Sequence, residues 1–176
     1  DLVGLLDTRT VRELMEEVHK FRPDVIFYGE GWTMKTELTK PNVTLCTQHH
    51  GDEVPGFAFF NDSLRDLLRG SVFYSHEKGF VAGASVDKHA LEQNFMGHPA
   101  WASSPAQTVN YVSCHDNNTL IDRLALGSPE APRELMIRMN HLAAAYSILS
   151  QGIPFIHAGE EMLRSKPDGK GSFEHN

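Results

Sequence analysis

Four short apolar runs, each followed closely by an acidic or amide side chain, constrain the fold of this chain most strongly. The runs are residues 25–28, 57–60, 109–112 and 153–156. The acidic and amide residues that follow them are, in chain order, Glu30, Asn61 and Asp62, Asp116, and Glu160 and Glu161. The first run, Val25-Ile26-Phe27-Tyr28, lacks polar alternation, which is typical of a strand buried on both faces. We therefore expect four strands that each deliver polar groups at their carboxyl end.

Helical periodicity separates these runs. We expect four helices: one at about 10–21, one that begins after residue 61, one at 87–96 and one at 132–150. In the first of them, Thr10 and Glu13 have the spacing of a capping box. The apolar faces expected for the first and last of these helices are Val11, Leu14, Met15, Val18 and Phe21, and Leu135, Met139, Leu142, Tyr146 and Leu149. Strands that alternate with helices predict an α/β fold built from parallel βαβ units. A barrel is favoured over a doubly wound sheet, because no glycine-rich phosphate loop follows any strand.

Composition and charge argue against two classes of partner. The 176 residues carry a formal net charge of -7 with ten histidines counted as neutral, whereas a nucleic-acid groove needs a basic surface. No apolar run approaches the ~20 residues that a membrane-spanning helix requires. We therefore expect no nucleic acid and no membrane among the partners. Cys46 and Cys114 are too few for a disulfide framework.

Asp1, Glu30 and Asp116 are the acids with the strongest claim to chemistry, because all three are expected at the carboxyl end of a strand. Ligands of parallel α/β folds gather at that end. Glycoside hydrolysis needs two carboxyl groups that flank the scissile bond, roughly 5–5.5 Å apart in retaining enzymes. A lone strand-end acid is more often a helix cap or a surface charge, and Asp7 and Asp62 are expected to be of this kind. The spacing alone indicates a barrel hydrolase or lyase.

Several stretches resemble signature regions of the alpha-amylase superfamily of glycoside hydrolases. Within that superfamily the resemblance is strongest to type I pullulanase, which cuts α-1,6 bonds. The stretches that carry it are Tyr28-Gly29-Glu30-Gly31-Trp32, Val109 to Asn117, Asp1 to Leu5, Ser150 to Glu161, and Leu163-Arg164-Ser165-Lys166. The resemblance covers essentially the whole chain. It implies the C-terminal half of a (β/α)8 TIM barrel, from the end of strand 4 to strand 8.

The same resemblance assigns roles to the three acids. Asp1 is implied to be the nucleophile that forms a covalent glycosyl intermediate, and Glu30 the general acid and then the general base. Asp116 is implied to bind the sugar hydroxyls more tightly as the ring flattens toward the transition state. His115, Trp32 and Asn117 are implied to bind the substrate, His115 through a hydrogen bond and Trp32 through the flat face of its indole ring.

The chain also departs from the family pattern. It opens on Asp1 rather than Met, and the Arg that usually precedes the nucleophile by two residues is absent. We expect residues 1–176 to be an internal piece, a partial catalytic barrel domain of a longer protein, with little or no activity by itself. Localisation stays open between the cytoplasm, slightly favoured, and secretion.

The expected substrate is an α-glucan polysaccharide or oligosaccharide, cut by a retaining double displacement. A branching enzyme or other transglycosylase of the same superfamily is the nearest alternative, and a non-catalytic glucan-binding relative is a more distant one. No cofactor is implied. Calcium is common in the wider superfamily, but no stretch of this sequence has the pattern of a calcium loop, so we predict no metal site.

Other chemically suggestive groups have simpler interpretations. Cys114 next to His115 is expected to be a small buried residue rather than a thiol nucleophile, because consecutive strand residues face opposite ways. The cluster of His49, His50, Asp52 and Glu53 matches no zinc spacing and is expected to be a solvated loop. Met136 and Met139 are expected to fill a core. The roles of Glu160 and Glu161, as turn caps or site residues, stay open, and Asp168 to Gly171 has the composition of a turn.

Overall fold

The structure, a computed structural model, describes residues 1–36 and 40–166, and the chain divides into two compact units. Unit 1 comprises residues 1–60, 97–109 and 151–153. Unit 2 comprises residues 61–96, 110–150 and, among the described residues, 154–166. The turn expected at Asp168 to Gly171 lies outside the described residues.

A parallel sheet confirms the α/β fold. Its strands are β1 (Phe27–Gly29), β2 (Phe57–Phe60), β3 (Thr108–Asn110) and β4 (Ile153–Pro154), in the order β1-β2-β3-β4. β1 pairs with β2 and β2 with β3, both in parallel. The strands are shorter than predicted, and β4 contains Pro154, which has no N–H to donate to a neighbouring strand. Each of the four is nevertheless followed closely by polar residues, as the sequence predicts.

The prediction that the first strand is buried on both faces is wrong. Ile26 is 61% exposed and Tyr28 is 50% exposed, and the strand begins only at Phe27. β1 is the first strand of the sheet order and has only β2 as its partner among the described residues. β2 and β3, which each have a strand on either side, are the buried ones: Phe57, Ala58, Phe59 and all three residues of β3 are almost inaccessible.

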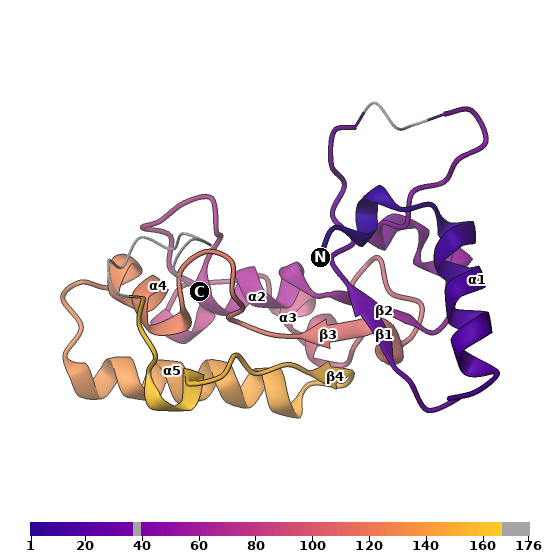
Figure 1. Cartoon of the computed structure of the whole chain (residues 1–176). Coiled ribbons are helices and arrows are strands. Elements are labelled where there is room, and N and C mark those ends of the chain that lie inside the picture. The colour runs from indigo at the N-terminus through magenta and orange to yellow at the C-terminus, as the bar shows by residue number, and fades with distance from the viewer. Residues whose placement is uncertain (37–39, 167–176) are drawn as a thin grey trace. The chain divides into compact units, whose positions relative to one another are not determined.

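Helix α1 (Thr8–His19) packs against β2 within unit 1 (Figure 1). Val11 and Met15 contribute to one core with Phe57 and Phe59, whereas Leu14 and Phe21 of the expected apolar face are exposed. The helix begins two residues before the predicted start. Its N-cap is Asp7, whose Oδ1 accepts a hydrogen bond from the Thr10 N–H at 2.9 Å, so the Thr10 and Glu13 capping box is not formed. The expectation that Asp7 is a cap is confirmed.

Unit 2 is built from four α-helices among its described residues. They are α2 (Asp62–Arg69), α3 (Lys88–Phe95), α4 (Leu120–Gly127) and α5 (Arg133–Leu149), and Figure 1 shows α4 near α5. Three of them were predicted; α4 was not. Its signal is the pair Thr119 and Asp122, since the Thr119 Oγ1 caps the helix and accepts from the Asp122 N–H at 3.4 Å. Asp62 is the first residue of α2, and the cap is Asn61.

Helix α5 turns only part of the predicted face to the core: Met139 is buried and Tyr146 packs against the core cluster, as expected. Met136, Met139 and Ala143 are buried in one cluster with residues of α2 and α4, which confirms the two methionines as core residues. Leu135, Leu142 and Leu149 of the expected stripe are at least 40% exposed. The helix carries apolar residues around most of its circumference, so periodicity alone cannot select one stripe.

Short 3-10 helices complete the described structure. They are η1 (Val3–Leu5), η2 (Gln48–Glu53), η3 (Phe80–Ala82), η4 (Pro105–Gln107) and η5 (Glu160–Met162). η1 begins two residues after Asp1, and η5 contains the acid pair whose role the sequence left open. No helix within 1–36 and 40–166 is long and apolar enough to span a membrane.

Candidate active site

The six predicted site residues lie in segments that adjoin short structural elements. In unit 1, Asp1 precedes η1, and Glu30 and Trp32 follow the end of β1. In unit 2, His115, Asp116 and Asn117 follow the end of β3. The sequence prediction that Glu30 and Asp116 come after strands is therefore confirmed at the level of the elements.

Glu30 is buried and receives the N-terminal segment of the chain. Glu30 is only 9% exposed, and its Oε2 accepts a hydrogen bond from the Leu2 N–H at 3.3 Å. Its carbonyl oxygen accepts a second bond from the Gly4 N–H at 3.0 Å. Two backbone amides of one short segment thus bind Glu30, and Asp1 is the residue next to the first of them. Unit 1 therefore brings the segment of one predicted acid against the carboxylate of another.

Two glycines make this close approach feasible. A Cβ on Gly31 would lie 2.4 Å from Phe59 Cδ1 and 2.9 Å from the Gln48 backbone nitrogen. A Cβ on Gly4 would lie 2.3 Å from the carbonyl oxygen of Trp32. Since backbone atoms cannot move aside easily, larger residues would displace the turn that carries Glu30 and Trp32. Trp32 itself is half-buried in this turn.

His115 and Asp116 lie together on the segment that follows β3 in unit 2. His115 Nε2 is 3.6 Å from Asp116 Oδ1, and their side chains are 47% and 39% exposed. Both groups can therefore reach a ligand while staying close to each other. Asn117, the next residue, has a φ of 62°, in the left-handed region that Asn tolerates better than most residues.

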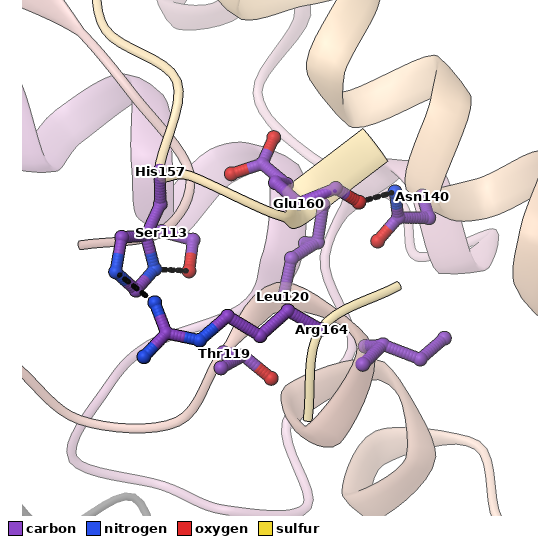
Figure 2. A pocket seen from close by; sticks show the side chains of 8 residues that line it. Ser113, Thr119, Leu120, Asn140, His157, Glu160 and Arg164 are labelled. Atoms are coloured by element: carbon purple, nitrogen blue, oxygen red, sulfur yellow. Dashed lines mark hydrogen bonds between the residues drawn. The ribbon is translucent and has the colours of Figure 1, made fainter. Parts of the chain in front are cut away.

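A small pocket of unit 2 adjoins this segment. Figure 2 shows His157 between Ser113 and Arg164 in its wall. Arg164 Nη1 lies 2.8 Å from His157 Nε2 and Ser113 Oγ lies 3.4 Å from Nδ1. Because a guanidinium only donates, Nε2 is the acceptor and the ring is neutral, with its proton on Nδ1. Burial, and next the Arg164 charge, lowers the pKa of His157.

Glu160 supplies the acid of this pocket. It is 4% exposed, and neither carboxylate oxygen has a hydrogen-bond partner among the described residues. Burial raises the pKa of Glu160 to about 7. Figure 2 shows the carboxyl group directed away from Asn140, whose Nδ2 donates at 3.0 Å to the Glu160 backbone oxygen instead. Of the two roles left open by the sequence, Glu160 lines a pocket, whereas Glu161 is exposed.

The alternative chemistries suggested by cysteine and histidine gain no support from the geometry. Cys114 is half-buried, and burial raises the pKa of its thiol, which disfavours the nucleophilic thiolate. In the 49–53 cluster, His50 Nδ1 lies 3.0 Å from the Leu45 carbonyl oxygen and Glu53 accepts from the Thr8 hydroxyl at 2.8 Å. No group of three or more His, Cys, Asp or Glu suited to a metal ion occurs in the described part of the chain.

Two buried cations near residues 115–118 were not identified from the sequence. Lys166 is 2% exposed and Arg69 is 3% exposed. Charged side chains are rarely buried to this degree, and neither residue has a local pattern that distinguishes it from a surface charge. Only the three-dimensional structure identifies them.

Comparison with known proteins gives a consistent result. No protein-family model matches the chain. The pullulanase of Bacillus subtilis strain 168 is 33% identical over 99% of this chain and 25% of its own length. The chloroplastic pullulanase 1 of Arabidopsis thaliana is 30% identical over 85% of this chain and 20% of its own length. The chain thus spans about a fifth to a quarter of these curated relatives.

Solved structures show the same similarity. The pullulanase of Anoxybacillus sp. LM18-11 in complex with maltotriose is 36% identical, with a TM-score of 0.91, over 99% of this chain and 25% of that one. The Paenibacillus barengoltzii pullulanase in complex with maltohexaose and alpha-cyclodextrin is 36% identical, with a TM-score of 0.90, over 100% of this chain and 29% of that one.

Proposed function

Because the chain belongs with the pullulanases in both sequence and fold, we propose that it carries part of the active site of a glycoside hydrolase cleaving α-1,6-glucosidic bonds. The substrates are pullulan and branched α-glucans, and the mechanism is a retaining double displacement. Residues 1–176 then form part of one catalytic (β/α)8 barrel domain, from the end of strand 4 to strand 8. The strand order β1-β2-β3-β4 and the parallel pairing of β1 with β2 and of β2 with β3 support this assignment.

The observation that carries the proposal is the hydrogen bond from the Leu2 N–H to Glu30 Oε2. The bond holds Leu2 against the carboxylate of Glu30, the proposed general acid, and Asp1, the proposed nucleophile, is the residue next to Leu2 in the chain. A retaining mechanism needs two carboxyl groups about 5–5.5 Å apart on either side of the bond. Asp1 attacks the anomeric carbon while Glu30 protonates the departing glycosidic oxygen. Glu30 then takes a proton from water, which attacks the covalent intermediate and releases Asp1.

The polar residues after β3 have a binding role in this proposal. Asp116 and His115 are partly exposed and offer one acceptor and one donor to sugar hydroxyl groups. If the Asp116 carboxylate binds the sugar hydroxyl groups more tightly as the sugar ring flattens toward the transition state, it lowers the activation barrier of the reaction as well as binding the substrate. Asn117 adds a polar group beside them, and the half-buried Trp32 gives a flat apolar face to a glucose ring.

The relatives support the class of substrate. Their solved structures contain maltotriose, maltotetraose and maltohexaose, which are oligosaccharides. We infer that this chain belongs to a site for α-glucan oligosaccharides or polysaccharides. The proposed steps use carboxyl groups and water and call for no redox cofactor.

The test compares the full-length protein with its Glu30→Gln variant on pullulan, amylose and a branched glucan. We expect Glu30→Gln to lower kcat by about 10²–10⁴-fold, because the glycosidic oxygen loses its proton donor. Glu13→Gln, an exposed change on α1, is the matched control and should leave kcat unchanged.

The products discriminate the alternatives. Release of maltotriose from pullulan by the wild type supports α-1,6 cleavage. Cleavage of amylose alone would overturn the assignment of the bond. Chain transfer without new reducing ends would assign a branching activity instead, and equal rates for wild type and Glu30→Gln would remove Glu30 from the mechanism.

A further inference from the structure

The segment that carries Asp116 is held at two backbone carbonyls, one on each side of that residue. Lys166 Nζ donates to the His115 carbonyl oxygen at 2.7 Å. Arg69 Nη1 donates to the Asn118 carbonyl oxygen at 3.0 Å. Between the two anchored carbonyls lie Asp116 and the left-handed Asn117. A backbone in this conformation persists when its surroundings fix it on both sides.

Both anchoring groups are cations that are almost inaccessible to solvent. Burial, and next the charge of Arg65, lowers the pKa of Arg69 to about 10, so the guanidinium is still protonated at neutral pH. Hydrogen bonds from charged donors are about twice as strong as neutral ones. Burying a cation is costly, and Arg69 Nε has no hydrogen-bond partner among the described residues. The bond that each cation makes to a backbone carbonyl is therefore a specific feature of the fold rather than an incidental surface contact.

Lys166 is itself fixed to the first turn of α4. Its backbone N–H donates to Asp122 Oδ2 at 2.8 Å, and the Ser165 hydroxyl donates to Asp122 Oδ1 at 2.5 Å. The Thr119 hydroxyl donates to Asp122 Oδ2 at 2.8 Å. One carboxylate therefore joins the chain after β4 to the start of α4, directly after the segment that carries Asp116.

The side chains on the anchored segment are accessible to solvent, whereas the groups that bind its backbone are buried. The backbone is bound by buried groups, whereas the His115 and Asp116 side chains are 47% and 39% exposed. We propose that Lys166 and Arg69 are positioning residues that act through the backbone to fix the place of Asp116. The inference rests on the proposed function, in which Asp116 binds the sugar most tightly in the transition state. A misplacement of about 1 Å in such a group can cost about 10²-fold in rate.

The central experiment is Lys166→Met in the full-length protein, which removes the donor and keeps an unbranched side chain. We expect kcat on pullulan to fall at least about 10-fold with KM changed less than about 2-fold, as when a transition-state interaction is weakened. Lys88→Met, at an exposed position on α3, is the control and should leave both constants unchanged.

A double-mutant cycle separates positioning from general stability. If Lys166 acts through Asp116, Lys166→Met should have little further effect on the residual kcat of the Asp116→Asn variant. A full, additive loss in that background would overturn the proposal, as would an unchanged kcat in a folded Lys166→Met protein. Asp122→Asn is a milder variant, because it weakens the contacts that hold Lys166 in place, and it should also lower kcat. If Lys166→Met does not fold, Asp122→Asn takes its place in the double-mutant cycle and is judged by the same criteria.

Amide hydrogen exchange of residues 115–119 gives a readout that is independent of activity. We expect faster exchange in Lys166→Met than in the wild type, with exchange in α5 unchanged. If the wild type does not cleave pullulan, the proposed function fails while the exchange result still decides whether Lys166 holds this segment. Unchanged exchange at 115–119 would reject the anchor itself.

Discussion

Glu160 shows how burial changes the behaviour of a single acidic residue. Its carboxyl group has no hydrogen-bond partner among the described residues, and burial raises its pKa to about 7 from 4.5. The folded protein therefore binds this proton more tightly than the unfolded chain does. The contribution to stability is complete below about pH 4.5 and is lost as the pH rises through about 7. The loss amounts to about 3 kcal/mol.

Glu160→Gln should remove this pH dependence, because a neutral amide has no proton to lose. We expect a higher free energy of unfolding than the wild type at pH 8 and a similar value at pH 5, measured by urea denaturation. Glu161→Gln, at the exposed neighbour, should retain the wild-type dependence. A wild-type and a Glu160→Gln curve that fall in parallel between pH 5 and 8 would contradict the buried acid.

At the scale of elements, the junction of β2 and α2 depends on one amide side chain. Asn61 Oδ1 caps α2 by accepting from the Leu64 N–H at 3.1 Å, and Asn61 Nδ2 donates to Asn110 Oδ1 at 3.2 Å. Asn61 and Asn110 are both fully buried. Asn61, the residue directly after β2, thus links the start of α2 to Asn110 at the end of β3.

Asn61→Ala should destabilise the protein by about 2–4 kcal/mol, since it removes a cap and leaves buried polar groups without a partner. Asn61→Asp keeps the cap acceptor but loses the amide donor and also buries a carboxyl group beside Asn110 Oδ1, so its effect sets an upper limit on the contribution of the bond to Asn110. Thermal unfolding of the two variants measures both contributions. A loss below about 0.5 kcal/mol for Asn61→Ala would show that water replaces both bonds.

At the scale of the whole chain, each compact unit is assembled from three separate stretches. The chain leaves unit 1 at residues 60, 109 and 153, each at or next to the end of a strand. Neither unit is therefore a continuous segment that could be excised. Among the described residues β1 has β2 as its one sheet neighbour, whereas a closed barrel gives every strand two.

The 176 residues alone should accordingly cleave pullulan far more slowly than the full-length protein, and should tend to aggregate. The reason is that the proposed barrel is incomplete and that Asp1 is a chain terminus in this piece. Reducing-sugar release and light scattering, compared at equal molar concentrations, test the two statements. A rate near that of the full-length protein would show that the segment contains all the residues that the reaction needs.

Much of this organisation follows from local pattern. Turn and cap residues such as Asp87 and Asn61 mark where helices begin, and the apolar run Phe57 to Phe60 coincides with a largely buried strand. Predictions of which face of a helix or strand is buried were less accurate. The predicted stripe of α5 was only partly right and the predicted burial of β1 was wrong, because both depend on which neighbours cover an element, and a single stretch of sequence does not encode its neighbours.

The sequence by itself determined the alternation of strands and helices and the acidic residues that follow strand ends, because both depend on nearest-neighbour chemistry. Tertiary structure alone decided which charges are buried. Lys166 and Arg69 look like surface cations in the sequence, yet each ends at a backbone carbonyl beside Asp116. Their bonds join residues about fifty positions apart, and only folding brings such groups into the dry environment in which a hydrogen bond is strong.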